Sequence, residues 1–544
     1  MHDETFDRAQ RLIQRLRTRT AQVTRRDVIR AAFAFSAATI AMSLAPRSVR
    51  AADGWVLPRF TGYPFTLGVA SGYPRADGIS LWTRLAPEPL QPDGGMVPDM
   101  IHIEWQVASD EQFTHIVRKG GVRAVPELAH SAHVDVRGLE PGRWYWYRFI
   151  CGDEVSPVGR TRTAEAPGSK LDKLRFAVAS CQHYEQAYFA AHRHLANEGL
   201  DLMFFVGDYI YESNWGDNLV RRHVGGEANT LDRYRVRHAQ YKSDPDLQAS
   251  HAAMPWAFTW DDHEVENDYA ADQSENLDPS FLLRRAGAYQ AFFEHMPMPL
   301  TMRPKANEMR IYDTLDYGEF ARFYLVDNRQ YRDPQACSDP YKGGGSNEVT
   351  EKECPVVMEP SRSMIGLPQE QWLDGAMANS RAQWNVIAQE TIFSRFGTLR
   401  DGEMTRWTDG WDGYPATRER VLASIATHQL RNPLILGGDI HAAVVADVHS
   451  NPDKPESPVL AAEFCGTSLA SQGWSETQFN PRLPQNPHVK YGNTTKRGYL
   501  AFEISKHGCD ARLRALDNEK RHDSGITTIA SFRVEDGKPG VEKV

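Results

Sequence analysis

The sequence predicts an α/β fold, a layered β-sandwich core flanked by helices, with an N-terminal all-β domain of the immunoglobulin-like type. Two observations predict it. Residues 53–165 hold short aromatic and β-branched segments punctuated by Gly and Pro. From Leu174 onward, fully apolar runs alternate with amphipathic segments, which is typical of buried strands connected by helices.

The first 52 residues have the order of a signal peptide. Arg25 and Arg26 precede the apolar run AAFAFSAATIAMSLA, and small residues follow near Ala51 and Ala52. The paired arginines resemble a twin-arginine signal. The run is shorter than the ~20 residues that span a bilayer. We therefore expect export by the twin-arginine machinery into the periplasm or beyond, without a transmembrane anchor; an amphipathic N-terminal helix is the alternative.

The next segment, 53–165, is expected to be the β-sandwich domain. Its predicted strands lie in GISLWTRLAPE, IHIEWQVASD and RWYWYRFICGD, and the stretch RTRTAEAPGSK has the composition of a polar linker. Residues 170–544 then form the expected α/β domain, including a C-terminal extension. Within it, YEQAYFAAHRHLANEG (184–199) and FLLRRAGAYQAFFEHM (281–296) are predicted helices. The two His of the first helix, 192 and 194, are expected at the surface.

Charge limits the class of partner. The net charge is −9, and residues 1–52 carry ten Arg and four acidic residues, a balance of +6 that leaves −15 for the remainder. This argues against specific nucleic-acid binding. Six Cys lie after the leader, and in an oxidising compartment disulfides are expected. Cys337 and Cys354 flank a Gly-rich loop that a disulfide between them would close.

Several predicted strands end in residues that bind metals. Ligands in α/β folds gather at the carboxyl ends of strands, so these side chains are expected to converge. They are Cys181 after AVAS, Asp208 and Tyr211 in GDYIY, Asp261, Asp262, His263 and Asn267 in WDDHEVEN, and Asp439 and His441 in GGDIH. If strand geometry persists to the end of LILGGDIH, both Asp439 and His441 point at the metals and Ile440 points into packing.

The residue types indicate two kinds of ion. One Asp can bridge two metals about 3.5–4 Å apart, the spacing used in phosphoester hydrolysis. Tyrosine has an ordinary pKa near 10, so binding it as phenolate requires a strong Lewis acid, for which ferric iron is the natural candidate. Thiolate and imidazole complete such a site. Carboxylate, Asn carbonyl and water suit calcium.

These motifs carry a family resemblance. GDYIYE, WDDHEVEN and GGDIH resemble the metallophosphoesterase core, which includes purple acid phosphatases. Together with ASCQ, VDNRQYR and FTLGVASGYPRADGISLWTRLAPEP they resemble PhoD-type alkaline phosphatases, over nearly the whole chain after the leader. The resemblance implies ferric iron held by Cys181, Asp208, Tyr211 and His441. It implies one or two calcium ions held by Asp208, Asp439 and Asn267, with Asp262 as the alternative to Asn267.

Three further residues are candidates for catalysis. His263 is expected to contact phosphate or to donate a proton to the leaving group, although it would also fit as the cap of a turn. Arg303 and Arg329 are candidates for charge-assisted hydrogen bonds to phosphate, against the common alternative of a solvated surface Arg.

The expected function is an exported hydrolase of phosphomonoesters, with phosphodiesters as a further substrate class, that acts through attack by a metal-bound hydroxide or oxide. The alternatives are a phosphodiesterase or phospholipase D-like enzyme on the same site, and a non-catalytic cell-surface protein stabilised by metals. Relative rates on monoesters and diesters separate the first two. The complete ligand set argues against the third.

Overall fold

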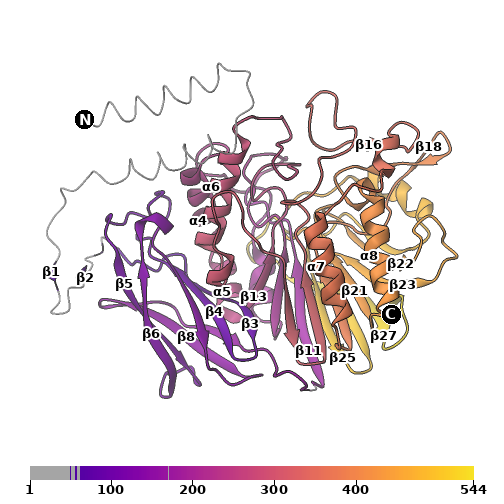
Figure 1. The fold of residues 1–544 in the computed structure, drawn as a ribbon. Coiled ribbons are helices and arrows are strands. Elements are labelled where there is room, and N and C mark those ends of the chain that lie inside the picture. Colours follow the sequence, from indigo (N-terminus) through magenta and orange to yellow (C-terminus); the bar gives the residue numbers. More distant parts are fainter. Residues whose placement is uncertain (1–48, 51–55, 58–59, 61, 170) are drawn as a thin grey trace.

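The computed structural model describes residues 49–50, 56–57, 60, 62–169 and 171–544. Most of the predicted signal peptide, residues 1–52, therefore lies outside the described residues. Val49–Arg50 (β1) pairs with Val56–Leu57 (β2). Figure 1 shows the N-terminal strands in indigo on one side of the molecule and the C-terminal strands in yellow on the other. Among the residues described, no helix has both the length and the apolarity to cross a bilayer.

A ten-stranded mixed sheet runs through the molecule in the order β28-β27-β26-β25-β11-β12-β13-β3-β4-β7. At its centre, β11 (Lys173–Ala179), β12 (Leu202–Val206) and β13 (Trp256–Thr259) are parallel. Every residue of β12, LMFFV, is buried, as expected for a strand covered on both faces. The remaining strands are β3 (Val69–Arg75), β4 (Gly78–Arg84), β7 (Ser131–Arg137), β25 (Gly498–Ser505), β26 (Gly508–Leu516), β27 (Ile526–Glu535) and β28 (Glu542–Lys543).

A second, seven-stranded sheet has the order β14-β15-β17-β21-β23-β22-β24. Its neighbours β15, β17, β21 and β23 are parallel to one another. The strands are β14 (Asp313–Tyr317), β15 (Ala321–Leu325), β17 (Trp384–Ala388), β21 (Pro433–Gly437), β22 (Ala443–His449), β23 (Val459–Cys465) and β24 (Val489–Asn493).

The two sheets pack face to face around aromatic side chains. The ring of Phe323 in β15 lies 5.3 Å from that of Phe176 in β11 and 4.7 Å from that of Phe204 in β12. Phe464 of β23 contacts Phe502 of β25 with ring centroids 5.2 Å apart. These contacts belong to one large core that joins both sheets. The layered α/β sandwich predicted from the sequence is confirmed.

Helices cover the outer faces of the sandwich (Figure 1). Helices α7 (Leu367–Ala378) and α8 (Pro415–Thr427) pack through a second core on the seven-stranded sheet. Helices α4 (Leu231–Lys242) and α6 (Phe281–His295) pack on each other, and α5 (Pro245–Ala253) contacts both α3 (Ala190–Leu195) and β3. The short α9 (Glu476–Phe479) lies in the chain between β23 and β24 of the seven-stranded sheet.

The predicted helix 281–296 is present as α6, but the predicted helix 184–199 is reduced to α3. Backbone groups before α3 bond elsewhere: the amide of Tyr188 donates to the carbonyl of Glu519. The expectation that His192 lies at the surface is wrong. Its ring is fully buried, with Nε2 lying 2.7 Å from Oε1 of Gln182.

The N-terminal β domain is a sandwich that shares a sheet with the core. One layer has the order β10-β8-β5-β6, with β9 paired to β8. It packs on β3, β4 and β7, which belong to the ten-stranded sheet. β3 joins the central strands where Gly72 pairs with Trp256. A Cβ at Gly72 would meet the carbonyl oxygen of Trp256 at 2.7 Å, so glycine permits this approach. The layer comprises β5 (Ile101–Ala108), β6 (Ile116–Ala124), β8 (Trp144–Cys151), β9 (Glu154–Val155) and β10 (Gly159–Arg162).

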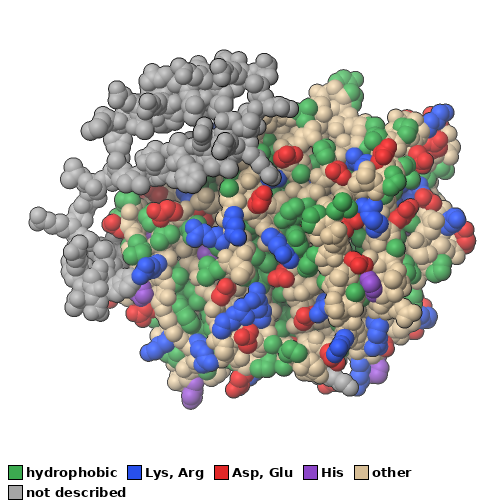
Figure 2. Space-filling view, in the orientation of Figure 1, with side chains coloured by type: hydrophobic (Ala, Val, Ile, Leu, Met, Phe, Trp, Pro, Cys, Tyr) green, Lys and Arg blue, Asp and Glu red, His purple; other side chains and the backbone are tan. Residues whose placement is uncertain are grey.

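Figure 2 shows acidic and basic side chains interspersed over the described part of one face, without a continuous basic patch.

Candidate metal centre

The candidate ligands follow the carboxyl ends of parallel strands at a constant offset. Each of four acidic or thiol residues stands two positions after the last residue of its strand. They are Cys181 after β11, Asp208 after β12, Asp261 after β13 and Asp439 after β21. β11 and β12 end in register, since Ala179 pairs with Phe205, and Val206 of β12 in turn pairs with Thr259 of β13. The two sheets therefore deliver their strand ends to one edge of the sandwich.

The backbone turns sharply at these residues. Cys181, Asp208, Asp439 and His441 have φ of 59°, 57°, 65° and 51°, the left-handed region that side chains other than Gly rarely adopt. Such strain concentrates at functional sites. It also corrects the expectation for LILGGDIH: β21 ends at Gly437, so strand alternation does not orient Asp439 and His441. Ile440 does pack into a core cluster.

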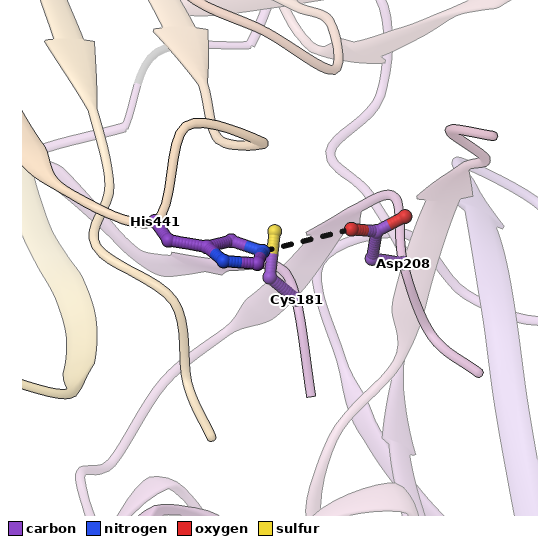
Figure 3. A group of neighbouring side chains, drawn as sticks. All are labelled: Cys181, Asp208 and His441. Carbon is purple, nitrogen blue, oxygen red and sulfur yellow. Dashed lines mark ion pairs between the residues drawn. The ribbon is translucent and has the colours of Figure 1, made fainter. Parts of the chain in front are cut away.

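One group consists of Cys181, Asp208 and His441, with one ligand atom of each lying within 4.8 Å of the others. Figure 3 shows the three side chains, with Nε2 of His441 lying 3.9 Å from Oδ2 of Asp208. Tyr211 completes it: its hydroxyl donates to Oδ2 of Asp208 at 2.7 Å and lies 2.9 Å from Nε2 of His441. The structure thus brings together the four residues to which the resemblance assigns iron.

The imidazole of His441 is held from two sides. Nδ1 lies 2.7 Å from the carbonyl oxygen of Gln472, which makes Nδ1 the donor and leaves the Nε2 lone pair facing the cluster. Trp215 stacks on the ring with centroids 5.8 Å apart. Burial, and then the charge of Arg497, lower the pKa of His441 to about 3, so the ring is neutral as a metal ligand must be.

A second group consists of Asp208, Asp262 and His263, again within 4.8 Å of one another. Asp208 therefore belongs to both groups, the position expected of a bridging carboxylate. Oε2 of Glu212 lies 2.7 Å from Nδ1 of His263. Burial opposes the charged form of His263, yet Glu212, Asp262 and Asp208 together raise its pKa well above the ordinary value.

Glu264, the acidic end of the DDHE motif, fixes the loops that carry these ligands. Its buried carboxylate accepts the backbone N–H of Asp208 at 3.1 Å and that of Asp261 at 2.9 Å. Gly207, between β12 and Asp208, has φ 99°, and a Cβ there would lie 2.5 Å from Cβ of Asp261. The sequence motifs predicted no role for Glu264 or Glu212, although Glu212 follows Tyr211 in GDYIYE and Glu264 ends DDHE.

The remaining candidates for calcium lie around the same edge. Oδ2 of Asp439 accepts from the hydroxyl of Thr391 at 2.5 Å, and the side chain of Asp439 is half-buried. Asn267 donates its side-chain N–H to Glu275 at 2.9 Å and its backbone N–H to Glu212 at 3.0 Å. Asp262 stands in the second group with Asp208. The choice between Asp262 and Asn267 as ligand stays a prediction.

The two arginines have different surroundings. Arg329 is fully buried: Nε lies 2.5 Å from Oδ1 of Asp261 and Nη2 lies 2.8 Å from Oδ2 of Asp409. Its guanidinium is thus engaged by protein carboxylates next to the second group. Arg303 is exposed at the end of η2 (Leu300–Met302). The turn that precedes it lies against β7 of the N-terminal sandwich, where the backbone N–H of Leu300 donates to Oδ2 of Asp135 at 3.2 Å.

The donor set fits a cation. Burial raises the pKa of Asp208 to about 7, against the opposing charge of His263, and Oδ1 of Asp208 is buried without a hydrogen-bond partner. Burial and the charge of Asp208 raise the pKa of both Cys181 and Tyr211 well above their ordinary values. A buried thiol, phenol and carboxyl that resist ionisation need a positive charge between them to become ligands.

Of the cysteines in the described part of the chain, two form a disulfide and four are free. Cys337 and Cys354 form a disulfide that closes the Gly-rich loop, which confirms that expectation. Among the described residues, Cys151, Cys181, Cys465 and Cys509 are free and buried. Cys181 is therefore available to the cluster.

Comparison with known proteins places the chain in a family. Residues 176–513 match the family described as PhoD-like phosphatase, and residues 51–165 match its N-terminal domain. The chain is 41% identical over 557 residues to alkaline phosphatase D of Bacillus subtilis (strain 168), covering 100% of this chain and 93% of that protein. A solved structure of PhoD superposes with a TM-score of 0.84 at 43% identity, covering 90% of this chain and 93% of that one.

A purple acid phosphatase, PPD1 from yellow lupin (Lupinus luteus) seeds, shares the fold with a TM-score of 0.55 at 11% identity, covering 86% of this chain and 73% of that one. The resemblance drawn from the sequence motifs is thereby confirmed. The core and the N-terminal domain match the family, and one relative is similar over the full length of the chain. This chain therefore belongs to the PhoD-like phosphatase family of enzymes.

Proposed function

We propose that this protein is an exported, metal-dependent phosphoester hydrolase that releases inorganic phosphate from phosphomonoesters and also accepts phosphodiesters. The observation that carries the proposal is the position of Asp208 between two side-chain groups, the candidate ligands Cys181 and His441 on one side, and Asp262 with the candidate proton donor His263 on the other. Family membership supports the same reaction class, and a full-length relative bears the name alkaline phosphatase D.

In this proposal, Cys181, Asp208, Tyr211 and His441 hold ferric iron. Asp208 and Asp439, with Asp262 or Asn267, hold one or two calcium ions. The support is chemical, because sulfur, phenolate and imidazole suit iron while carboxylate and amide oxygen suit calcium. Bound there, the ions supply Lewis-acid chemistry, which neutralises phosphate charge and lowers the pKa of water.

Side chains of the protein itself supply a proton and hold the loops of the site in position. His263 carries its proton on a ring fixed by Glu212 at 2.7 Å, so Nε2–H is available to a phosphate oxygen or to the departing alkoxide. Arg329 does not reach out to substrate in this scheme. It holds Asp261 and Asp409 through 2.5 Å and 2.8 Å contacts and so keeps the loops after β13 and β15 in place.

The test is metal analysis of the purified enzyme combined with turnover of paired monoesters and diesters. We expect iron and calcium in the protein, phosphate release from monoesters, and loss of both metals and turnover in Asp208→Ala. Faster turnover of diesters would make the enzyme a phosphodiesterase. Correctly folded protein with its metals bound but without turnover of either ester class would contradict the proposal.

We further propose the division into a twin-arginine signal peptide (1–52), a β-sandwich domain (53–165) and a catalytic domain (170–544). Arg25 and Arg26 before an apolar run support the export route. Replacing both by Lys is expected to retain the protein in the cytoplasm, measured by cell fractionation. Unchanged export would remove the twin-arginine assignment and leave the enzymatic one intact.

A further inference from the structure

A cavity of about 350 Å³ lies beside the candidate metal centre. Its walls include Ile392, Phe396, Trp407, Trp411, Ile440 and Trp474, so three indoles and a phenyl ring face one space. Trp411 is buried, while Trp407 and Trp474 are half-buried. Small-molecule sites commonly have volumes of about 300–1,000 Å³ and apolar, aromatic linings. The cavity has the size and the lining of a binding site for a small apolar group.

The cavity is built from the same loops as the metal centre. Ile440 stands between Asp439 and His441. Ile392 directly follows Thr391, whose hydroxyl donates to Asp439 at 2.5 Å. Consecutive Cα atoms are about 3.8 Å apart. The Cα atom of Ile440 therefore lies about that far from those of two candidate ligands, and Ile392 lies equally close to the residue that donates to one of them.

A third loop makes the same connection. The hydroxyl of Ser471 lies 2.9 Å from that of Tyr211, and the carbonyl of Gln472 accepts from His441 at 2.7 Å. Two residues further on, Trp474 lines the cavity. The loop 471–474 thus holds two candidate iron ligands at one end and an aromatic wall at the other.

Two carboxylates of the cavity have partners within the protein, while the hydroxyl of Ser394 and Nε of Arg482 have none among the described residues. Glu348 accepts from Nη2 of Arg482 at 3.1 Å, and that guanidinium lies 5.0 Å from the ring of Trp474. Asp412 accepts from Arg418 at 2.7 Å. Few donors or acceptors remain for the hydroxyls of a sugar or of glycerol, which a binding site must pair. The lining favours an aromatic or bulky apolar group instead.

We infer that this cavity is a leaving-group subsite, and that the enzyme prefers phosphoesters whose alcohol carries an aromatic or bulky apolar group. The inference rests on the proposed function, because a leaving group has meaning only if the metal centre hydrolyses phosphoesters. Burial of the ring between Trp407 and Trp474 supplies binding free energy, while the phosphoryl chemistry stays at the metals. No residue of the cavity takes part in bond breaking.

The test compares 2-phenylethyl phosphate with ethyl phosphate, whose alcohols are similar in acidity, so that leaving-group chemistry does not differ. For the metal-loaded full-length enzyme we expect kcat/KM to be about tenfold higher for the phenylethyl ester, chiefly through KM. Trp407→Leu and Trp474→Leu are expected to bring this ratio close to one. Trp372→Leu, which removes a half-buried indole from α7, is the matched control and should keep the wild-type ratio.

A binding measurement on the wild-type enzyme tests the inference without any variant. Competitive inhibition of the wild-type enzyme by 2-phenylethylphosphonate should be about tenfold stronger than inhibition by ethylphosphonate. Turnover of both esters with equal kcat/KM, or equal inhibition by both phosphonates, would overturn the inference alone. Absence of turnover with either ester would overturn the proposed function, and the inference would fall with it.

Discussion

Oε2 of Glu212 lies 2.7 Å from Nδ1 of His263, and the same carboxylate accepts the backbone N–H of Asn267 through its other oxygen at 3.0 Å. This buried acid directly follows the motif GDYIY. It therefore orients the proposed proton donor and also tethers the loop of a candidate calcium ligand. Against the opposing effect of burial, the charge of Glu212 raises the pKa of His263 and so favours the charged imidazole.

Glu212→Gln is expected to lower kcat through His263, because the amide keeps the shape but not the charge that holds the proton. His263→Gln should lower kcat by about 10²–10⁴, the range for loss of a general acid. A double-mutant cycle on kcat measures the coupling. If Glu212 acts through His263, the double variant should be no slower than His263→Gln; additive losses would show that Glu212 acts on its own.

Tyr211→Phe is expected to abolish the visible absorption of the iron form, since phenolate-to-iron charge transfer requires the hydroxyl oxygen. The ring should still pack beside His263, whose centroid lies 4.2 Å away, so the fold should be retained. Absorption spectra with iron content measured on the same sample provide the check. A colourless wild-type enzyme that is fully active with zinc alone would remove the iron assignment.

Asp439→His is expected to shift the metal preference of the second site from calcium towards zinc or manganese, because imidazole suits those ions and carboxylate suits calcium. Activity should fall in calcium and recover partly in the other metals. His441→Ala should instead lose iron and turnover in every metal. Bound metals are counted by elemental analysis; wild-type calcium content in Asp439→His would mean that this residue is not a ligand.

Removing the disulfide between Cys337 and Cys354 by substitution of both with Ser should lower the free energy of unfolding by about 3 kcal/mol, the loop-closure value for a loop of this length. The closed loop also donates the N–H of Ser346 to Asp268 at 2.8 Å. Urea unfolding measures the loss. Adding reductant to the double Ser variant is the control and should cause no further change.

Arg329→Met is expected to lower the free energy of unfolding by about 3–5 kcal/mol, because it leaves Asp261 buried without its ion-pair partner, while Asp409 keeps Arg332 at 3.0 Å. Arg303→Met, at an exposed site, should change it by about 0.5 kcal/mol or less. Denaturant unfolding compares the two variants. If the Arg329→Met protein is as stable as wild type but has a raised KM, Arg329 binds phosphate instead of stabilising the fold.

The sequence by itself determined which residues end the strands. Apolar runs such as LMFFV followed by Gly-Asp placed Asp208 at a carboxyl edge, and the motif set pointed to the family before any geometry was known. These features are local: the hydrophobic pattern defines a strand and its end without reference to the rest of the chain. The disulfide between Cys337 and Cys354 could likewise be predicted from the sequence, since the two residues flank one loop.

Only the tertiary structure decided how those ends meet. Asp208 joins two groups because strands of two different sheets finish at one edge, and left-handed turns at Asp439 and His441, rather than strand alternation, orient these two side chains. The sharing of a sheet between the N-terminal sandwich and the core, the burial of Arg329 among carboxylates and the aromatic cavity beside Ile440 follow from packing between distant segments. Such contacts depend on the whole set of long-range interactions, which no local pattern in the sequence specifies.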